Sequence, residues 1–372
     1  MIYIDNAATT FPKPRSVIGE LNLCVKKYCG NPGRSSHILS LKSSEKIYLT
    51  REKIARMLGV NTPENIVFTY NATHGLNLAI KTFVTSHCHV LTSDFEHNSV
   101  IRPLEALKRK EGISYSIFDT DKDLKASLRE KIKKNTKGII CSIASNVTGD
   151  TLSLKVLSNF AKENGLFLII DASQAIGHTK IDLNEAHCDA LCAPGHKALF
   201  GIQGSGFVYF RDKYRRDSFI EGGSGSESMS VYMPDLLPEG YEAGTLSTPA
   251  IVSIGAGVEY VNSVGIDEIE SKLNVLTDAA YDRLSTVEGI RIYKRGNGLI
   301  SFNIDDIPSS TIASHLDEHG ICVRGGLHCA PSIHKKLGTL EQGAVRISFS
   351  YLNRLKDVDG LYHAVKAIKR EK

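Results

Sequence analysis

The sequence lacks any apolar stretch of membrane-spanning length, since its longest candidate, Leu166–Ile170, stops at Asp171. A transmembrane helix needs about 20 predominantly apolar residues. The segment Met1–Asp5 has no basic leader followed by an apolar run, so we expect no signal peptide. The net charge of +4 is small for 372 residues. It indicates neither nucleic-acid binding nor a polybasic membrane surface.

Cysteine spacing also excludes two classes of protein. The eight cysteines show no disulfide-scaffold spacing, and Cys188 and Cys192 form a CxxxC pair that no second pair with zinc spacing follows. We therefore expect no metal site. Reduced thiols of this kind are typical of a cytoplasmic protein.

What the sequence does contain is a long alternation of apolar runs and amphipathic segments. The expected strands are 66–68, 89–92, 113–118, 138–144, 166–171 and 206–210. The expected helices between them are 72–84, 98–110, 124–134 and 154–163. Continuous apolar strands separated by helices predict an α/β fold with a mainly parallel central sheet covered on both faces. Ligands in such sheets bind beyond the carboxyl ends of the strands.

The length favours a large domain plus a smaller one. Residues 222–249 are rich in Gly, Ser and Pro and predict a long functional loop. Beyond it we expect a smaller α+β domain with helices at 251–264, 267–287, 310–318 and 357–369 and short strands at 299–303 and 345–348. We place the large domain at residues 15–255 and the small domain at residues 1–14 and 256–372.

The first candidate for chemistry is Lys197, in Gly195-His196-Lys197, between the apolar run 190–193 and the Gly-rich run 201–206. A lysine in a polar loop at the sheet edge forms an imine with an aldehyde. Most loop lysines, however, are simply solvated, so this motif alone favours the solvated interpretation.

Three further features precede Lys197 at the same predicted edge. Asp171 ends the most apolar strand, where a carboxylate is costly unless it meets a cation or caps a helix. Thr73 opens a helix directly after a strand, and such a helix start either binds phosphate or needs only its cap. His97 follows another strand, where an imidazole either stacks on a flat ring and transfers protons or is structural.

These residues and others fall into motifs that resemble the class V aminotransferase family, and within it the cysteine desulfurase and selenocysteine lyase branch. The motifs extend from residue 5 to about residue 353. They are Asp5-Asn6-Ala7-Ala8-Thr9-Thr10, Glu96-His97, Ser145-Asn146, Asp171-Ala172-Ser173-Gln174, Gly195-His196-Lys197, Glu242-Ala243-Gly244-Thr245 and Arg324-Gly325-Gly326-Leu327-His328-Cys329-Ala330.

The resemblance implies the pyridoxal 5′-phosphate (PLP) fold type I, with PLP held as a Schiff base on Lys197. It implies that Asp171 pairs with the pyridine nitrogen and that His97 stacks on the ring. Gln174 and Asn146 are implied to face the phenolic oxygen.

The resemblance also implies a phosphate pocket and an oligomer. The implied phosphate ligands are Thr73, the amide of His74, and His196. Thr245 is implied to reach the phosphate of the other subunit, which makes the protein a homodimer.

On the substrate side, the resemblance implies that Arg346 binds the substrate carboxylate, with its planar fork of donors. Cys329 is implied to attack the substrate sulfur and to become a persulfide. A thiolate is favoured there if His328⁺ or Arg324 lies close, whereas the alternative is a buried structural cysteine. The residues implied to lie near the substrate are Ala7, Asn31, His37 and Arg324.

The resemblance therefore implies a PLP-dependent cysteine desulfurase that converts L-cysteine to L-alanine, with Lys197 moving the Cα proton. The short cysteine loop implies a protein partner that accepts the sulfur. The alternatives are a selenocysteine lyase, another class V β-lyase, epimerase or aminotransferase, and a non-catalytic sulfur-relay protein.

Two positions depart from the family pattern. Pro194 stands where relatives carry a Ser or Thr phosphate ligand, so Thr73 or Ser226 is expected to replace that ligand. His74 stands where relatives often carry an acidic residue, and it either adds positive charge near the phosphate or points away.

Overall fold

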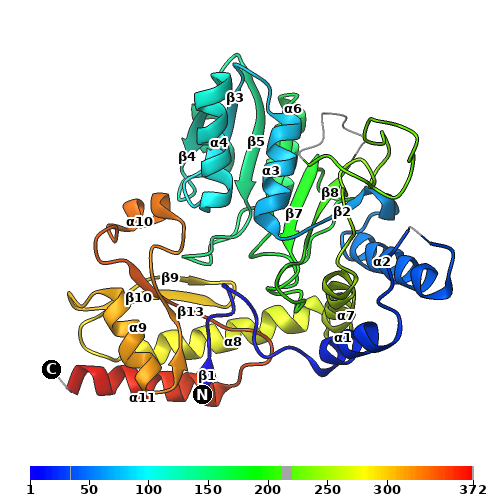
Figure 1. Ribbon diagram of the computed structural model, residues 1–372. Coiled ribbons are helices and arrows are strands. Elements are labelled where there is room, and N and C mark those ends of the chain that lie inside the picture. The colour runs from blue at the N-terminus through cyan, green and yellow to red at the C-terminus, as the bar shows by residue number, and fades with distance from the viewer. Residues whose placement is uncertain (34, 212–219, 371–372) are drawn as a thin grey trace.

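The seven-stranded sheet of the larger unit has the order β2-β8-β7-β6-β5-β3-β4 in a computed structural model, which describes residues 1–33, 35–211 and 220–370 (Figure 1). The strands are β2 (Ile66–Thr69), β3 (His89–Ser93), β4 (Ser114–Phe118), β5 (Thr136–Ser142), β6 (Phe167–Asp171), β7 (Ala190–Pro194) and β8 (Gly206–Phe210). Strands β3, β6 and β7 are buried along nearly their whole length. Such continuous burial is typical of a sheet covered on both faces.

The sheet is mainly parallel, as the sequence predicts. β4, β3, β5, β6 and β7 pair in parallel, whereas β8 is antiparallel to both β7 and β2. The alternation of apolar runs did not predict this reversal. A parallel partner requires a crossover connection, usually a helix. The segment 195–205 between β7 and β8 contains no helix, so β8 returns beside β7 as an antiparallel neighbour.

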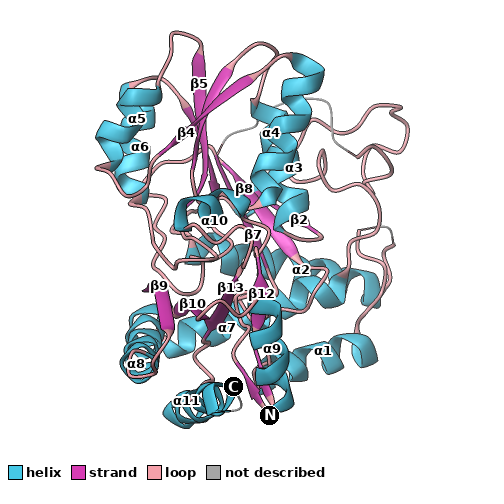
Figure 2. Ribbon diagram, turned by 90° about the vertical axis from the view of Figure 1, so that its left-hand side faces the viewer, coloured by secondary structure: helices cyan, strands magenta, loops and turns pink. Residues whose placement is uncertain are grey.

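Helices cover both faces of this sheet (Figure 2). α3 (Ala72–Phe83) and α4 (Asn98–Glu111) pack on one face, where Leu76, Val100 and Leu104 join the strand residues in one core. The other face is covered by α5 (Leu124–Lys131), α6 (Leu154–Glu163), α2 (Ile38–Met57) and α7 (Thr248–Val264). The sheet is packed between these two cores, so the residues at the carboxyl ends of its strands are held in defined positions.

The smaller unit is an antiparallel sheet of order β12-β13-β10-β9 with helices against it. Its strands are β9 (Ile290–Gly296), β10 (Leu299–Ile304), β12 (Arg324–Gly326) and β13 (Ala344–Ser348). Its helices are α8 (Ile266–Leu284), α9 (Ser309–Glu318) and α11 (Leu355–Arg370), and the short α10 (Pro331–Leu337) follows the predicted cysteine loop. β1 (Ile2–Tyr3) pairs with β11 (Ile321–Cys322), which attaches the N-terminal segment to this unit.

A long helix connects the two units. α7 contributes Ile251 and Ile254 to the core of the large unit, and Ala256 and Val261 to that of the small unit. α1 (Arg15–Lys27) packs beside α7, and the single turn Pro63–Asn65 precedes β2. The predicted boundary after residue 255 therefore falls inside one continuous helix, and the division into 15–255 against 1–14 and 256–372 stays a prediction.

The predicted long loop is present, because the described residues from 220 to 247 contain neither helix nor strand. Within the described parts of the chain, no helix combines the length and the apolar character that crossing a membrane requires.

A buried ion pair secures this loop to the sheet. Glu242 accepts from Arg51 Nη2 at 2.5 Å and from the amide of Phe68 at 2.6 Å, and both charged side chains are buried. Replacing Glu242 by Gln leaves the Arg51 charge uncompensated, so we expect it to lower the free energy of unfolding by about 3 kcal/mol. Urea unfolding measures this decrease. The double variant Arg51→Met/Glu242→Leu removes both charges and should recover most of the stability. Equal free energies of unfolding for Glu242→Gln and the wild type would contradict the expectation.

Candidate active site

Most of the predicted functional residues meet in one cavity at the carboxyl edge of the sheet, where the large unit faces the small one. The cavity has a volume of about 210 Å³. The carboxyl ends of β3, β5, β6 and β7 lead into it, as expected for a ligand site in this class of sheet. Its lining includes Ala7, Thr73, His97, Asn146, Asp171, Gln174, Pro194, His196, Lys197, Arg324, His328 and Arg346.

Lys197 is positioned by its backbone. Its carbonyl accepts from Thr10 Oγ1 at 2.8 Å and from the amide of Phe200 at 2.8 Å. The neighbouring carbonyl of His196 accepts from Thr9 Oγ1 at 3.1 Å and from Lys13 Nζ at 3.0 Å. Side chains of the N-terminal segment therefore hold the backbone of the lysine loop by hydrogen bonds, which brings residues 9–13 and 196–197 together at one site.

The amine of Lys197 sits in an environment that favours its neutral form. Burial is the largest cause that lowers its pKa to about 8; Asp171 opposes this shift, and the guanidinium groups of Arg346 and Arg324 add to it. A neutral amine is the nucleophile that attacks a carbonyl carbon. Lys197 is therefore a cavity-lining lysine with a lowered pKa, rather than a solvated loop residue.

This pKa leads to a testable pH dependence. The fraction of neutral amine is small below pH 8 and saturates above it, so the rate of covalent attachment of an added aldehyde should rise with pH and level off just above pH 8. An ordinary lysine would continue to gain reactivity until about pH 10.4. Stopped-flow absorbance on addition of PLP measures this rate, and a rise that continues without a plateau would contradict the expectation.

Asp171 lies at the end of β6 and is buried. Its Oδ1 accepts from the amide of Ser173 at 2.9 Å, and Ser142 Oγ lies 3.4 Å from its Oδ2. Ser142 also donates from its amide to both carboxylate oxygens of Glu96, at 2.9 and 3.1 Å. Burial raises the pKa of Glu96 to about 7. Ser142 therefore contacts two carboxyl groups, that of Asp171 and that of Glu96.

Sequence motifs included Glu96 without assigning it a role, and they did not include Ser142. The register of β5 and β6 reveals the contact between Ser142 and Asp171, because these two residues stand opposite each other. Register of this kind is not visible in the sequence alone.

His97 caps α4 and lines the cavity. Its Nδ1 accepts from the amide of Ser99 at 3.0 Å, so the neutral ring carries its proton on Nε2. Burial lowers its pKa to about 4, with Lys197 and the two arginines adding to the shift and Asp171 opposing it, so the imidazole is neutral at pH 7. Ser99 Oγ lies 2.7 Å from Thr73 Oγ1, which links His97 to the start of α3.

Arg346 lies on β13, buried at the small-unit side of the cavity. Its Nη2 donates to Asp5 Oδ1 at 2.8 Å and its Nη1 to the carbonyl of Asn146 at 3.0 Å. Its Nε has no hydrogen-bond partner among the described residues, although it is buried. A cation fixed at two corners with a free donor is suited to bind an anionic group.

Cys329 is exposed at the edge of the same site, on the loop after β12. Arg324 Nη2 lies 3.9 Å from its Sγ and is the cation beside the thiol. His328 is buried, and burial holds its pKa well below the usual range, so its ring is neutral and does not supply a positive charge. The interpretation of Cys329 as a buried structural cysteine is wrong, because the residue is exposed.

Two predicted site residues use their polar atoms within the protein. Asn146 Nδ2 donates to the carbonyl of His328 at 2.8 Å, and Gln174 Nε2 donates to that of Ala7 at 3.0 Å. Both still line the cavity.

Four other predicted site residues lie outside this cavity. The His74 amide donates to the N-cap Asn71 at 2.9 Å, and its ring stacks on Tyr70. His74 and Thr245 line a separate cavity beside β8. Asn31 and His37 are exposed on the loop before α2.

Thr73 and Ser226 are the two residues expected to replace a phosphate ligand at position 194. Thr73 lines the cavity around Lys197, whereas Ser226 is exposed and does not line it. The role of Thr73 as a phosphate ligand stays a prediction.

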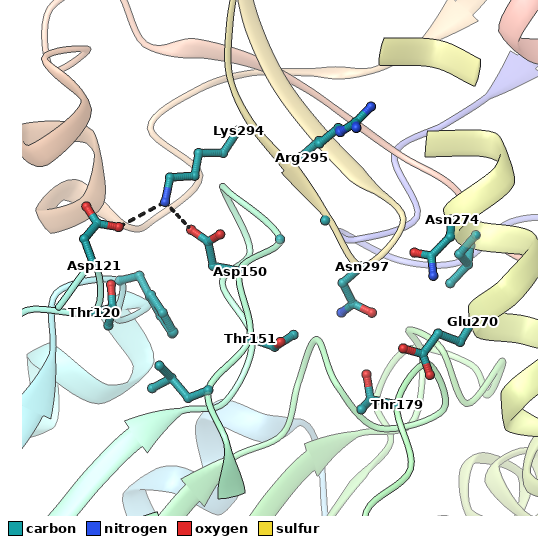
Figure 3. Close-up of a pocket in the computed structure, with 15 residues that line it drawn as sticks. Thr120, Asp121, Asp150, Thr151, Thr179, Glu270, Asn274, Lys294, Arg295 and Asn297 are labelled. Carbon is teal, nitrogen blue, oxygen red and sulfur yellow. Dashed lines mark hydrogen bonds and ion pairs between the residues drawn. The ribbon is translucent and has the colours of Figure 1, made fainter. Parts of the chain in front are cut away.

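A larger cavity of about 560 Å³ lies between the two units (Figure 3). Several of its ionic groups are already paired: Lys294 bridges Asp121 at 3.0 Å and Asp150 at 3.2 Å, and Arg295 pairs with Asp278. Among the described residues that line it there is no cysteine, no histidine and no lysine with a lowered pKa. Perturbed titratable groups mark functional sites, so the smaller cavity around Lys197 is the candidate active site.

Comparisons with known proteins identify the family. A family model described as Aminotransferase class-V matches residues 2–361. The chain belongs to the aminotransferase class-V family. The resemblance inferred from its motifs is thereby confirmed.

Two similar proteins are named "Probable cysteine desulfurase". The one from Pyrococcus abyssi is 31% identical, over 96% of this chain and 92% of its own length. The one from Halalkalibacterium halodurans is 30% identical, over 99% of this chain and 93% of its own length. An apo structure of cysteine desulfurase from Thermococcus onnurineus NA1 is 28% identical in sequence and has a TM-score of 0.92. The match covers 100% of this chain and 95% of that chain. The predicted PLP fold type I is confirmed by this likeness.

Proposed function

We propose that the protein is a PLP-dependent cysteine desulfurase that converts L-cysteine to L-alanine and leaves the sulfur on Cys329. One observation carries the proposal: a lysine with a lowered pKa, a buried strand-end aspartate and a buried arginine line one cavity, with an exposed thiol at its edge. Full-length relatives named cysteine desulfurase support it.

The residues present fit PLP. Lys197 offers a neutral amine for the aldehyde, and Asp171 offers a carboxylate for the pyridinium nitrogen. His196 Nδ1 is buried without a hydrogen-bond partner among the described residues, as expected of a donor or acceptor that awaits a ligand. Thr73 stands at the start of α3, where helix amides and a hydroxyl suit a phosphate. When bound, PLP supplies an electron sink for carbanion chemistry at the amino-acid Cα.

The protein side chains then have separate tasks. Arg346 binds the substrate carboxylate through Nε, the donor that has no partner among the described residues, and Asp5 keeps the guanidinium in place. Lys197, once its amine is free, moves the Cα proton, for which a pKa of about 8 is suited. His97 is neutral and holds an Nε2–H donor at the cavity.

Cys329 performs the sulfur transfer. Its Sγ, which lies beside Arg324, attacks the substrate sulfur. A sulfur–sulfur bond forms while the sulfur–carbon bond breaks, and the electron pair of the broken bond remains on the carbon fragment. Protonation of that fragment yields L-alanine. The persulfide stays on an exposed loop, where an acceptor protein or thiol can reach it.

The proposal includes a homodimer. Thr245 lines a cavity separate from that of Lys197, together with His74 and Gly206 of β8. In the proposed dimer, Thr245 reaches the cofactor phosphate of the second subunit. Met229, Val231 and Tyr232 on the same loop are largely exposed, which suits burial against a partner.

An alanine-release assay with L-cysteine, L-cysteine sulfinate and L-selenocysteine, with and without a thiol acceptor, tests the proposal. We expect alanine from cysteine and faster release with the acceptor. Release from selenocysteine alone would replace the proposal with a selenocysteine lyase, and formation of pyruvate or glutamate would replace it with another reaction of the family.

A further inference from the structure

The backbone of the Cys329 loop is strained. His328 and Cys329 have φ values of 51° and 55°, two consecutive non-glycine residues in the left-handed region. Side chains disfavour this conformation, and such residues persist only where the surroundings hold them. The loop therefore needs a structure that keeps the thiol in place.

Part of that structure comes from the large unit. The carbonyl of His328 accepts from Asn146 Nδ2 at 2.8 Å, and the carbonyl of Cys329 accepts from the amide of Asn98 at 2.7 Å. Ala330 and Ile333 pack against Phe95 of the large unit in a small apolar cluster. These contacts fix the loop from the side of the large unit.

On the other side, a chain of three buried polar side chains reaches the loop from α10. His328 Nε2 lies 3.2 Å from the carbonyl of Arg324, and His328 Nδ1 lies 3.2 Å from His334 Nε2. His334 Nδ1 lies 2.8 Å from Thr339 Oγ1. All three side chains belong to residues that are at most 3% exposed. The imidazole planes differ by 20° and their centroids are 5.4 Å apart, which suits a hydrogen bond between ring edges.

The direction of this chain follows from its end. A carbonyl only accepts, so His328 donates from Nε2 to Arg324 and carries no proton on Nδ1 when neutral. His334 must then donate from Nε2 to His328, and Thr339 must donate to His334 Nδ1. Burial lowers the pKa of His334 to about 4 and holds that of His328 well below its usual range, so both rings are neutral at pH 7 and the order of donors is fixed.

The chain ends on the residue that faces the thiol. Arg324 accepts through its carbonyl from His328, and its guanidinium lies 3.9 Å from Cys329 Sγ. His334 thus acts on the loop at two points, on the strained His328 and, through it, on the strand that carries Arg324. His334 itself is completely buried and does not line the cavity.

We propose that His334 is a positioning residue for Cys329: its Nε2–H, donated to His328, holds the loop conformation that brings the thiol to Arg324. The inference rests on the proposed role of Cys329 as the group that takes up sulfur. The inference gives α10, through His334, a role in the reactivity of the Cys329 thiol.

The test is the labelling rate of Cys329 by iodoacetamide in the PLP-loaded protein, followed by mass spectrometry of its peptide. His334→Phe keeps a flat ring but removes the donor. Removing one buried hydrogen bond shifts a conformational equilibrium by about tenfold, so the thiol is held beside Arg324 less often and we expect labelling of Cys329 to slow by up to that factor. His334→Gln places an amide donor near the same point and should recover most of the rate. Cys29, a second exposed thiol, is the internal reference and should keep its rate.

The same variants are assayed for alanine release, where kcat should fall with labelling while KM for cysteine stays within about twofold. Unchanged labelling in folded His334→Phe, or a Gln variant as slow as the Phe variant, would overturn the proposal. If His334→Phe does not fold, Thr339→Val decides: slower labelling supports the proposal and an unchanged rate overturns it. A wild type that releases no alanine would remove the proposed function and leave the labelling result intact, so the two failures are distinguishable.

Discussion

Replacement of Lys197 by Ala is expected to abolish alanine release from L-cysteine, by at least roughly a thousandfold. Lys197 is the one lysine among the described residues that line the cavity, and its amine both anchors the cofactor aldehyde and moves the Cα proton in the proposed reaction. The variant should also lack the visible absorbance that PLP shows when it is attached to the protein. Absorbance spectra of the purified variant and an alanine assay check both effects.

Lys197→Arg is the matched control, because it retains a cation in the cavity but cannot form an imine. We expect it to be as inactive as Lys197→Ala. Activity like that of the wild type in either variant would end the assignment of Lys197. A wild type that stays colourless with added PLP would instead support a non-catalytic role for this fold.

Replacement of Cys329 by Ala is expected to stop sulfide release from L-cysteine, again by roughly a thousandfold or more, since within the described parts of the chain no other thiol stands beside Arg324. Cys329 does not line the cavity around Lys197, so PLP absorbance should be unchanged. Activity toward L-selenocysteine should survive in part, because selenium leaves without an obligatory thiol attack. Sulfide and alanine assays on both substrates measure this division.

Cys29→Ala is the control for Cys329, because Cys29 is also an exposed thiol but lies between α1 and α2 and does not line the Lys197 cavity. It should behave as the wild type. Full sulfide release from Cys329→Ala, or none from Cys29→Ala, would contradict the assignment.

The fold was predictable where burial dictates the sequence. The predicted strands that correspond to β5 and β6 contain the apolar runs 139–141 and 166–170, since both faces of a parallel sheet are covered. Their predicted limits agree with the structure to within a few residues. The direction of β8 was not predictable, because it depends on the connection 195–205. The pairing of β1 with β11 was also missed, since so short a strand carries no periodic pattern.

Some residues of the candidate site could also be predicted from the sequence, and others could not. Lys197, Asp171 and His97 could be placed together because each follows or ends a strand or apolar run, and the structure brings all three to one cavity. His74 and Thr245 could not be placed, because motif order does not tell which cavity a side chain enters. His334 was invisible for a different reason: its importance lies in a tautomer fixed by the carbonyl of Arg324, through His328.

The central claim is that sulfur passes from L-cysteine to Cys329 as alanine is formed. The most direct measurement is a single turnover of the PLP-loaded wild type with L-cysteine and no thiol acceptor, with alanine counted and the Cys329 peptide weighed by mass spectrometry. We predict one alanine per active site and one added sulfur atom on Cys329, removable by a thiol. Alanine formation with Cys329 unmodified, or a persulfide on another cysteine, would contradict the account.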